Sequence, residues 1–549
     1  MSSILIRNGR IVDGSGNPWF RGDVAVENGI ITSVESRLPA EGFDVIIEAD
    51  GKMVAPGFVD IHSHSDFVLP LKRHQSLLEP LLRQGVTTII TGNCGFSPAP
   101  VSQEYLDLAK SSTAWMCAED LAWNWRTYAE FLNRLRANGL AVNVGQLSSH
   151  GSIRIAVMGM SSRQPSGEEM SRMLQMLEED LEAGAIGLSL GLGYPPGMYS
   201  KTEELLEFGK VLAGHPGRPM VFHLRGLCET FTSAVKEAIK IGGKLGIPIH
   251  CSHFVAVGPE NWHRVDEGIA MVEEARRSGV DITYDMYPYV AGNTTLTALY
   301  PPEALDGGTE ALLAKLRDPA QRAKVREDIE DIVPGWPSWL PGAWSDNFVR
   351  SFRPENILVT WVPGAANKRF EGKSLSEVGE LLGGDWFDAL VKLTLDEHGE
   401  AMILVVGAGG NLEDETHLRR ILTRPYASIA TDAVLIGRGK ANPAGFGAFA
   451  RVLGKYAREE KLFSMEEAVR KMTSLSLQRY GVRDRGLIRT GMKADIVVFD
   501  PEQITDRATL TEPEQFAEGV EYVLVNGRVV VERGSMKECL PGELLLGRS

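Results

Sequence analysis

Short apolar runs alternate with helical segments through the middle of the chain. Eight of these runs have the length and the β-branched content of buried strands. Strands that alternate with helices are typical of a parallel sheet, so we predict an α/β protein with a (β/α)8 barrel; an open doubly wound sheet is the alternative. The eight predicted strands are residues 53–64, 87–94, 141–150, 185–192, 219–224, 247–253, 280–287 and 427–433.

The two ends of the chain carry a different pattern, in which β-rich runs flank Asn-Gly pairs. Such a pair between two β-rich runs favours a two-residue hairpin. We therefore expect hairpin turns at Asn8-Gly9, Asn28-Gly29 and Asn526-Gly527. Strands from both termini then pair into one small β-sandwich, the alternative being two unrelated β ribbons. The predicted parts are residues 1–57 and 486–549 for the sandwich and residues 58–485 for the barrel.

A long segment, residues 291–425, separates the seventh and eighth predicted strands. It is far longer than an ordinary βα loop, and it contains Trp336, Trp339 and Trp344 among several prolines. This aromatic content favours an insertion that acts as an active-site lid or forms a subdomain. A plain surface insertion is the alternative.

Composition and charge narrow the partners of this protein. Of its 549 residues, 43% are hydrophobic, and the formal net charge is −15. An acidic chain without a basic run is a poor partner for nucleic acid or an anionic membrane, and no apolar run approaches the ~20 residues of a membrane span. The start lacks the regions of a signal peptide, and the five cysteines are too scattered for a disulfide framework. We expect a cytoplasmic protein.

Potential metal ligands lie where the predicted strands end. His62 and His64 are two residues apart, so they project the same way at the mouth of the barrel, where two imidazoles suit one divalent metal. A single histidine or a single cysteine is more often structural. Independent structural explanations become implausible when five strand ends carry such groups. The mixture of sulfur, nitrogen and oxygen donors indicates zinc, as one or two ions. The six candidates are His62, His64, Cys94, His223, His253 and Asp432.

Longer segments resemble the D-aminoacylase (N-acyl-D-amino-acid deacylase) family of the amidohydrolase superfamily. The resemblance covers nearly the whole chain, and it implies a metal-dependent hydrolase barrel with zinc. It also implies that His62, His64, Cys94, His223 and His253 are metal ligands. The segments that carry it are residues 56–66, 92–95, 149–154 with 157–159, 187–197, 287–292 and 446–454.

The resemblance also implies a reaction, the hydrolysis of a C–N bond in an amide substrate. Asp432 matches the family's catalytic aspartate, which accepts a proton from the metal-activated water and returns it to the leaving nitrogen. Many superfamily members bridge two metals with a lysine on the fourth strand. Residues 187–191 contain no lysine, which supports Cys94 as the substitute ligand. His250 is interpreted as structural.

Three positions depart from the family pattern. Val255 and Ala444 stand where basic residues are usual, and Asn293 stands where serine is usual. The missing cations are those expected to hold a free carboxylate. Either other cations replace them, or the substrate is a neutral or cyclic amide, an imide or a carbamate. The candidate replacements, whose other reading is ordinary surface charge, are Arg225, Arg438 and Lys440.

Further residues near the predicted mouth are candidates for substrate binding, with core packing as the other interpretation. Tyr287 and Tyr289 are expected to face the same way at the end of the seventh strand, and His150 follows the third. The expected partner is a small-molecule amide, and a homo-oligomer is left open. A hydantoinase or dihydroorotase type of enzyme and a non-catalytic scaffold barrel are the rival functions. The substrate-binding candidates are His150, Arg225, Tyr287, Tyr289 and Asn293.

Overall fold

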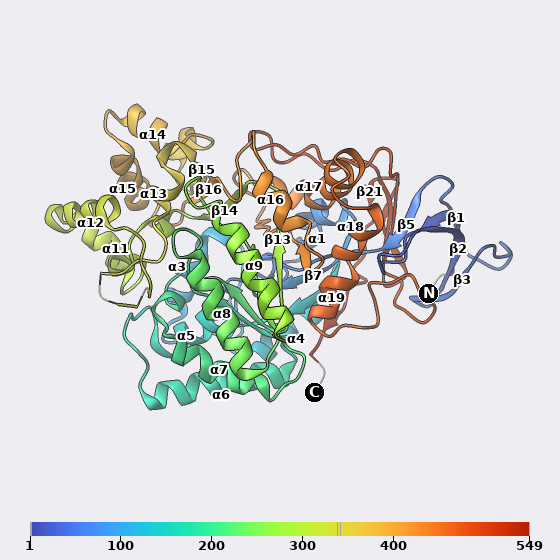
Figure 1. Ribbon diagram of the computed structural model, residues 1–549, viewed down its shortest axis with the longest axis horizontal. Helices are drawn as coiled ribbons and strands as arrows, with labels where there is room; N and C mark the ends of the chain where they lie inside the picture. Colours follow the sequence, from blue (N-terminus) through green and yellow to red (C-terminus); the bar gives the residue numbers. More distant parts are fainter. Residues whose placement is uncertain (1–2, 338, 341, 548–549) are drawn as a thin grey trace.

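A barrel of parallel strands forms the centre of the computed structural model, which describes residues 3–337, 339–340 and 342–547 (Figure 1). The third strand is interrupted at Leu147, so that β8 pairs with β7 and β9 pairs with β10. A parallel bridge between Ser63 and Ala433 joins the first strand to the last. The predicted barrel is therefore confirmed. Its strands are β6 (Phe58–Asp60), β7 (Val86–Thr91), β8 (Asn143–Gln146), β9 (Ser148–Ser149), β10 (Leu188–Gly191), β11 (Met220–His223), β12 (Ile249–Cys251), β13 (Ile282–Met286) and β17 (Ala427–Ile429).

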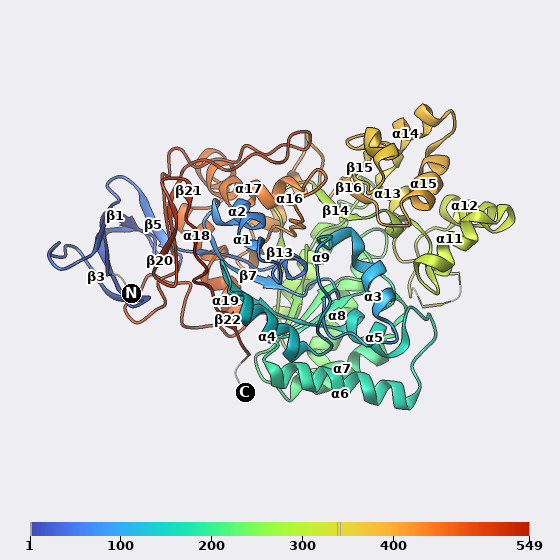
Figure 2. The same ribbon diagram turned by 180° about the vertical axis from the view of Figure 1, so that it is seen from behind.

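Helices cover the outside of the barrel (Figure 2). Buried side chains of the barrel strands form a separate apolar cluster. That cluster contains Ile61, Ile90, Leu147 and Val221, one residue from each of four strands or their extensions. The interior is thus packed rather than open. The covering helices are α1 (His74–Leu77), α2 (Glu79–Leu82), α3 (Leu106–Thr113), α4 (Tyr128–Asn138), α5 (His150–Met158), α6 (Gly167–Ala183), α7 (Thr202–Ala213), α8 (Phe231–Leu245), α9 (Arg264–Arg277), α16 (Thr416–Leu422), α17 (Pro443–Arg451), α18 (Met465–Lys471) and α19 (Ser474–Arg479).

Strands from both ends of the chain share one sheet. Antiparallel pairing of β5 with β18 joins the two contributions. A bridge between Ile30 and Lys493 joins β3 to the segment before β18, so the sheet curls back on itself. The curled sheet encloses its own apolar core. The expected sandwich is thus one curled sheet. Its strands are β1 (Ile4–Ile11), β2 (Phe20–Glu27), β3 (Ile30–Glu35), β4 (Val45–Glu48), β5 (Met53–Pro56), β18 (Ile496–Phe499), β19 (Val520–Val525), β20 (Arg528–Glu532) and β21 (Ser535–Met536).

The prediction of a hairpin turn at Asn8-Gly9 is wrong. β1 runs through these residues and pairs with β2 on both sides of them, with a register shift between Ile6 and Gly9. Asn8 has a φ of 61° and donates its N–H to the Asp23 carboxylate over 2.8 Å. The pair therefore forms a β-bulge, because a left-handed Asn serves a bulge as well as a turn. The other two Asn-Gly pairs do join adjacent strands.

The C-terminal segment also differs from the expectation that residues 486–549 stay with the terminal sheet. Its last strand, β22 (Leu544–Leu545), pairs in parallel with β8 of the barrel. The chain therefore returns to the barrel after it has completed the terminal sheet.

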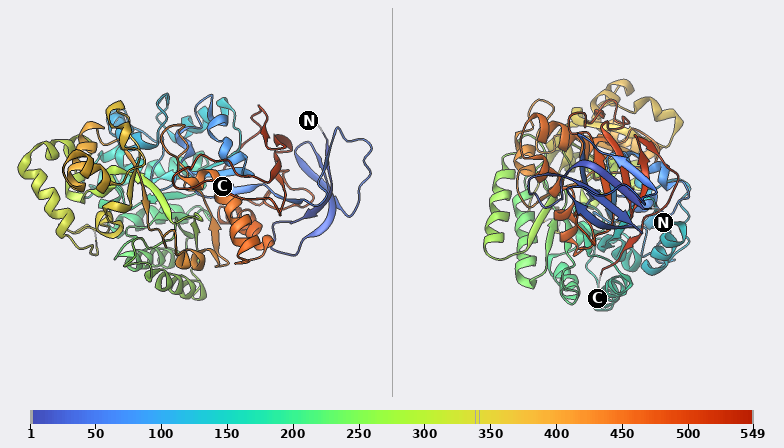
Figure 3. Two further views of the ribbon diagram at one scale, coloured as in Figure 1. Left: turned by 90° about the horizontal axis from the view of Figure 1, so that it is seen from above. Right: turned by 90° about the vertical axis from the view of Figure 1, so that its right-hand side faces the viewer.

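The segment between β13 and β17 forms a separate layer at the end of the molecule opposite the terminal sheet (Figure 3). Asp346 ties this layer to the loop after β11, since its carboxylate accepts the backbone N–H groups of Leu227 and Cys228. Within the described residues, no helix is both long and apolar enough to cross a membrane. The antiparallel strands are β14 (Ala291–Thr295), β15 (Ile357–Trp361) and β16 (Met402–Val406), with helices α10 (Pro302–Leu305), α11 (Thr309–Arg317), α12 (Pro319–Asp331), α13 (Phe348–Phe352), α14 (Leu375–Leu382) and α15 (Trp386–Asp396).

Candidate metal centre

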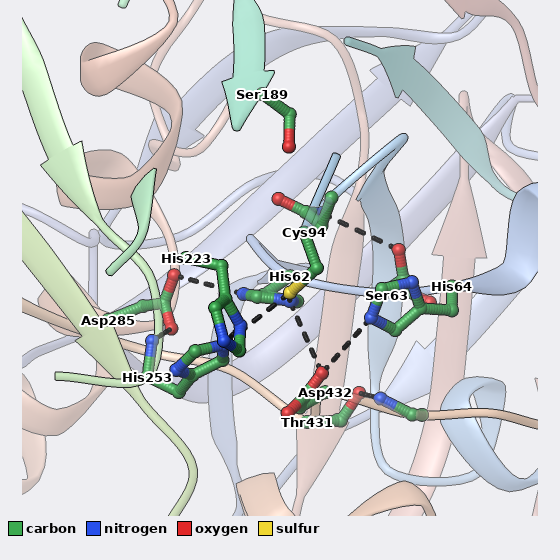
Figure 4. A network of polar contacts seen from close by, with 12 residues as sticks. His62, Ser63, His64, Cys94, Ser189, His223, His253, Asp285, Thr431 and Asp432 are labelled. Atoms are coloured by element: carbon green, nitrogen blue, oxygen red, sulfur yellow. Dashed lines mark hydrogen bonds and ion pairs between the residues drawn. The ribbon is translucent and has the colours of Figure 1, made fainter. Parts of the chain in front are cut away.

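The barrel topology brings all six predicted ligands together at the carboxyl ends of its strands (Figure 4). Their metal-binding atoms fall into two groups, and within each group these atoms lie within 4.8 Å of one another. Cys94 belongs to both groups, which therefore form two adjacent candidate metal positions with a shared sulfur. The first group is His62, His64, Cys94 and Asp432, and the second is Cys94, His223 and His253.

The individual distances are those of a compact cluster. The Cys94 Sγ atom lies 3.4 Å from Nε2 of His62 and 3.4 Å from Nε2 of His253. The Asp432 Oδ1 atom lies 3.2 Å from Nε2 of both His62 and His64. The Asp432 side chain is 13% exposed and is thus the most open of the groups that it meets here.

Three of the candidate ligands have backbone conformations that side chains rarely adopt. The φ angles of Cys94, His253 and Asp432 are 52°, 32° and 53°. Each residue follows directly after a barrel strand or its last turn, where a left-handed residue reverses the chain and redirects the side chain. Such conformations cost about 1–3 kcal/mol each and cluster at functional sites. These strained backbone conformations lower the stability of the fold, and they orient the three side chains toward one another.

The charges of the cluster stabilise one another. Burial raises the pKa of the Asp432 carboxyl, but His62 and His64 oppose it and hold that pKa well below its ordinary value. Burial also raises the pKa of the Cys94 thiol, yet His62, His223 and His253 hold it well below its usual range. Asp432 is therefore an anion at neutral pH, and the imidazoles favour the thiolate form of Cys94, the form that binds a metal.

The donor set fits a bound divalent metal. Thiolate, imidazole and carboxylate are the ligands that zinc prefers in proteins. Nδ1 of His64 is buried and has no hydrogen-bond partner among the described residues. A cluster of buried ionisable groups this dense is costly unless the charges are neutralised, and a cation at either position would do that.

Two acidic residues at the centre were missed by sequence reasoning. Asp60 lies at the end of β6 and Asp285 lies inside β13, and both are fully buried. Asp285 accepts the backbone N–H of the predicted ligand His253, and Asp60 accepts that of Thr431, the residue before Asp432. The available signal was a single acid within an otherwise apolar strand. His250 contacts Thr283 and Asp285 and lies outside both ligand groups, as its structural interpretation requires.

Two of the predicted substrate-binding residues, His150 and Arg225, form buried contacts with glutamates outside the metal centre. His150 is buried at the start of α5, where its Nε2 lies 2.8 Å from Glu204. Arg225 is also buried, and its guanidinium donates to Glu237 over 3.0 and 3.3 Å. Neither belongs to the two ligand groups, and the charge of Arg225 is already matched by that carboxylate.

The two tyrosines do not act together, which corrects the expectation that they face the same way. The Tyr289 hydroxyl donates to Asp506 over 3.0 Å, while burial and then the charge of Asp432 raise the pKa of Tyr287. Of these two tyrosines, Tyr287 is therefore the one whose hydroxyl is influenced by the charge of Asp432. Asn293 lies in β14, where its amide contacts Met402.

An apolar pocket begins beside His223. The Tyr194 ring lies 4.8 Å from that imidazole, and the Tyr194 hydroxyl lies 2.9 Å from the Thr294 hydroxyl of the insertion. A side chain on Gly193 would meet His223 Nε2 at 2.7 Å, so the backbone approaches the ligand closely here. The lining contains no charged side chain and includes Phe96, Met160, Met198, Tyr300, Leu305 and Leu312.

Comparison with known proteins accords with this geometry. The amidohydrolase family model matches residues 45–252 and 416–531. N-acyl-D-aspartate deacylase from Alcaligenes xylosoxydans xylosoxydans is 31% identical, over 99% of this chain and 95% of that protein.

Two solved structures match over almost the whole length of both chains. One is a D-aminoacylase with a binuclear metal centre, with a TM-score of 0.81, 30% identity and 100% coverage of both chains. The other is N-acyl-D-glutamate deacylase from Bordetella bronchiseptica with zinc and a phosphonate mimic of the tetrahedral intermediate, with a TM-score of 0.81, 29% identity and 99% coverage of both chains. The chain belongs to the amidohydrolase family, within its D-aminoacylase branch.

Proposed function

We propose that this protein is a zinc-dependent hydrolase that cleaves the C–N bond of an N-acylated amino acid or a closely related amide. The observation that carries the proposal is the buried cluster of His62, His64, Cys94 and Asp432 at the barrel mouth. The zinc and the intermediate mimic in the Bordetella relative support it.

Two sets of side chains would hold the metal. His62, His64, Cys94 and Asp432 form one position, and His223 and His253 complete a second position with Cys94. When bound, zinc supplies Lewis-acid polarisation of the scissile carbonyl and lowers the pKa of the attacking water.

Asp432 is the group that moves the proton. Its pKa is held well below the ordinary value, so at neutral pH it is a carboxylate that accepts a proton from the attacking water. It then donates this proton to the leaving nitrogen. Its side chain is partly exposed while those of His62 and His64 are buried, so Asp432 is the more accessible group for a substrate.

A second candidate substrate class is a neutral amide. Arg225 is paired with Glu237, and Arg438 is paired with Glu119 and stacked on Trp361. Val255 is a buried apolar residue, and no charged side chain lines the pocket beside His223. Of the proposed replacement cations, only Lys440 has neither a hydrogen-bond nor an ion-pair partner for its ammonium group among the described residues. A free carboxylate would therefore find few unpaired cations near the centre.

A substrate panel tests both candidates. Zinc-loaded protein is incubated with N-acetyl-D-amino acids, N-acetyl-L-amino acids and the carboxyl-blocked amides of each, and released amine is quantified. Release from the free D-acids, reduced in a Lys440→Gln variant, supports the deacylase. Release from the blocked amides alone supports the neutral substrate. If zinc-loaded protein releases no amine from any compound, the proposed hydrolase is overturned.

The setting of the reaction belongs to the same proposal. All five cysteines are unpaired, which accords with the reducing cytoplasm expected for this protein. The partner is a small amide molecule, and sedimentation tests whether the protein forms a homo-oligomer.

A further inference from the structure

A buried carboxylate on β13 contacts both groups of candidate ligands. Asp285 is 0% exposed, although an isolated buried carboxylate is costly. Its Oδ2 atom lies 2.9 Å from His250 Nε2, and its Oδ1 atom accepts the backbone N–H of His253 just after the same strand, β12. No step of the proposed reaction uses Asp285, so the presence of a buried carboxylate at this position requires another explanation.

The first contact concerns the ring of His62. Asp285 Oδ2 lies 3.5 Å from His62 Nδ1, while His62 Nε2 faces Cys94 and Asp432. Only a nitrogen without a proton can bind a metal, so the proton of this imidazole must reside on Nδ1. The contact is electrostatic, because His62 Nδ1 has no hydrogen-bond partner among the described residues, and a carboxylate at this distance stabilises the tautomer with the proton on Nδ1.

The second contact concerns the backbone of His253. Asp285 Oδ1 accepts the His253 N–H over 2.7 Å, and the Asp285 carbonyl accepts the N–H of Phe254 over 2.9 Å. His253 has a φ of 32°, a strained conformation that needs support from its surroundings. These two bonds hold the turn that points His253 at Cys94.

His250 keeps the carboxylate in place. Its Nε2 lies 2.9 Å from Asp285 Oδ2, and its Nδ1 lies 2.8 Å from the hydroxyl of Thr283. If His250 Nδ1 accepts the hydroxyl proton, His250 Nε2 donates to Asp285. The chain of contacts therefore runs from Thr283 through His250 and Asp285 to His62.

We propose that Asp285 is the positioning residue that couples the two metal positions, by setting the tautomer of His62 and by pinning the backbone of His253. This inference rests on the metal binding of the proposed function. It predicts that loss of one carboxylate, which is not itself a ligand, weakens zinc binding at both positions.

Asp285→Asn tests this, with Asp281→Asn as the matched control. Asp281 lies just before the same strand but pairs with Arg479 and makes no contact with a candidate ligand. Zinc affinity and stoichiometry are measured by competition with a chromophoric chelator, and the thiolate-to-cobalt absorption band is recorded on cobalt-loaded protein. We expect Asp285→Asn to lower zinc affinity about 10–100-fold at both positions and to weaken that band, and Asp281→Asn to change neither.

Other outcomes have definite meanings. If folded Asp285→Asn binds zinc within twofold of the parent protein, the positioning role is overturned while the proposed hydrolase stands. If the parent protein binds no zinc, the proposed function and this inference both fall. Should Asp285→Asn not fold, His250→Leu decides, because it leaves the carboxylate but removes the imidazole that donates to it. A smaller loss of zinc affinity supports the coupling, and an unchanged affinity overturns it.

Discussion

Asp60 and Thr431 join the first and last strands of the barrel through two hydrogen bonds. The carboxylate of Asp60 accepts the backbone N–H of Thr431 over 2.9 Å and its hydroxyl over 2.5 Å. Thr431 precedes Asp432, and Asp60 also accepts the N–H of His62 over 3.3 Å. Burial raises the pKa of Asp60 to about 7, against the opposing effect of the hydrogen bonds from Thr431 and His62. The junction that aims two members of the cluster therefore depends on this pair.

Replacement of Thr431 by valine tests the junction. Valine keeps the shape but removes the hydroxyl, so a buried oxygen of Asp60 loses a donor and the free energy of unfolding falls by about 1–3 kcal/mol. Urea denaturation of the metal-free protein measures this. Thr431→Ser, which retains the hydroxyl, serves as the control. Equal stability of the two variants would contradict the importance of this bond.

Asp432→Asn separates proton transfer from metal binding. The amide cannot accept the proton of the attacking water, so we expect kcat to fall about 10²–10⁴-fold. Its oxygen remains beside His62 and His64, and much of the zinc is retained. Amine release and metal content are measured on the same preparation. Full activity in this variant would rule out the proposed proton transfer.

Cys94→Ala removes the sulfur that belongs to both ligand groups. We expect zinc binding at both positions to weaken, because no other side chain is shared between them. Cys117→Ala is the control, since Cys117 is buried, contacts Thr113 and has a pKa that burial raises to about 12. Elemental analysis after dialysis against a chelator measures the bound metal. Retention of both ions in Cys94→Ala would refute the shared sulfur.

The lowered pKa of Glu204 predicts that the free energy of unfolding falls at acidic pH. Burial raises its pKa, but His150 and Arg154 outweigh this and lower it from 4.5 to about 2. Because the folded-state pKa lies below the unfolded one, the stabilisation is complete above about pH 4.5 and disappears as the pH falls towards 2. We expect Glu204→Gln to lower the free energy of unfolding by about 3–5 kcal/mol at pH 7.

The difference between that variant and the parent protein should shrink in acid. Unfolding is measured from pH 7 to pH 3 on both proteins. The matched control is Glu169→Gln at the more exposed Arg163–Glu169 pair, for which about 0–1 kcal/mol is expected. A difference that stays constant over this range would show that the Glu204 charge contributes nothing.

Regular periodicity predicted the large features well. All eight predicted barrel strands contain observed strands, because buried parallel strands are continuous apolar runs that few other elements imitate. Ligand candidates such as His223 and Asp432 could be grouped although they lie far apart in the chain. Parallel strands in a barrel end on one rim, so topology converts positions along the chain into proximity.

Other features depend on information that is not local. Asp60 and Asp285 are single acids in apolar runs, and their partners lie on other strands. The bulge at Asn8 has the same residue pair as the true hairpins and differs only in what the following residues pair with. The sequence does not show that Arg225 is paired; the structure places Glu237 3.0 Å from its guanidinium. In each case the deciding contact joins segments that the sequence does not relate.

The antiparallel pairing of β5 with β18 has a consequence for biosynthesis. The first strands of the terminal sheet leave the ribosome early, but their partner is made only after the whole barrel and its insertion. Until then, β5 presents unpaired backbone groups at an open edge, and such edges promote aggregation. Closing a loop of this length is also a slow step. Expression of this protein should therefore respond to chaperone supply and to slower translation at low temperature.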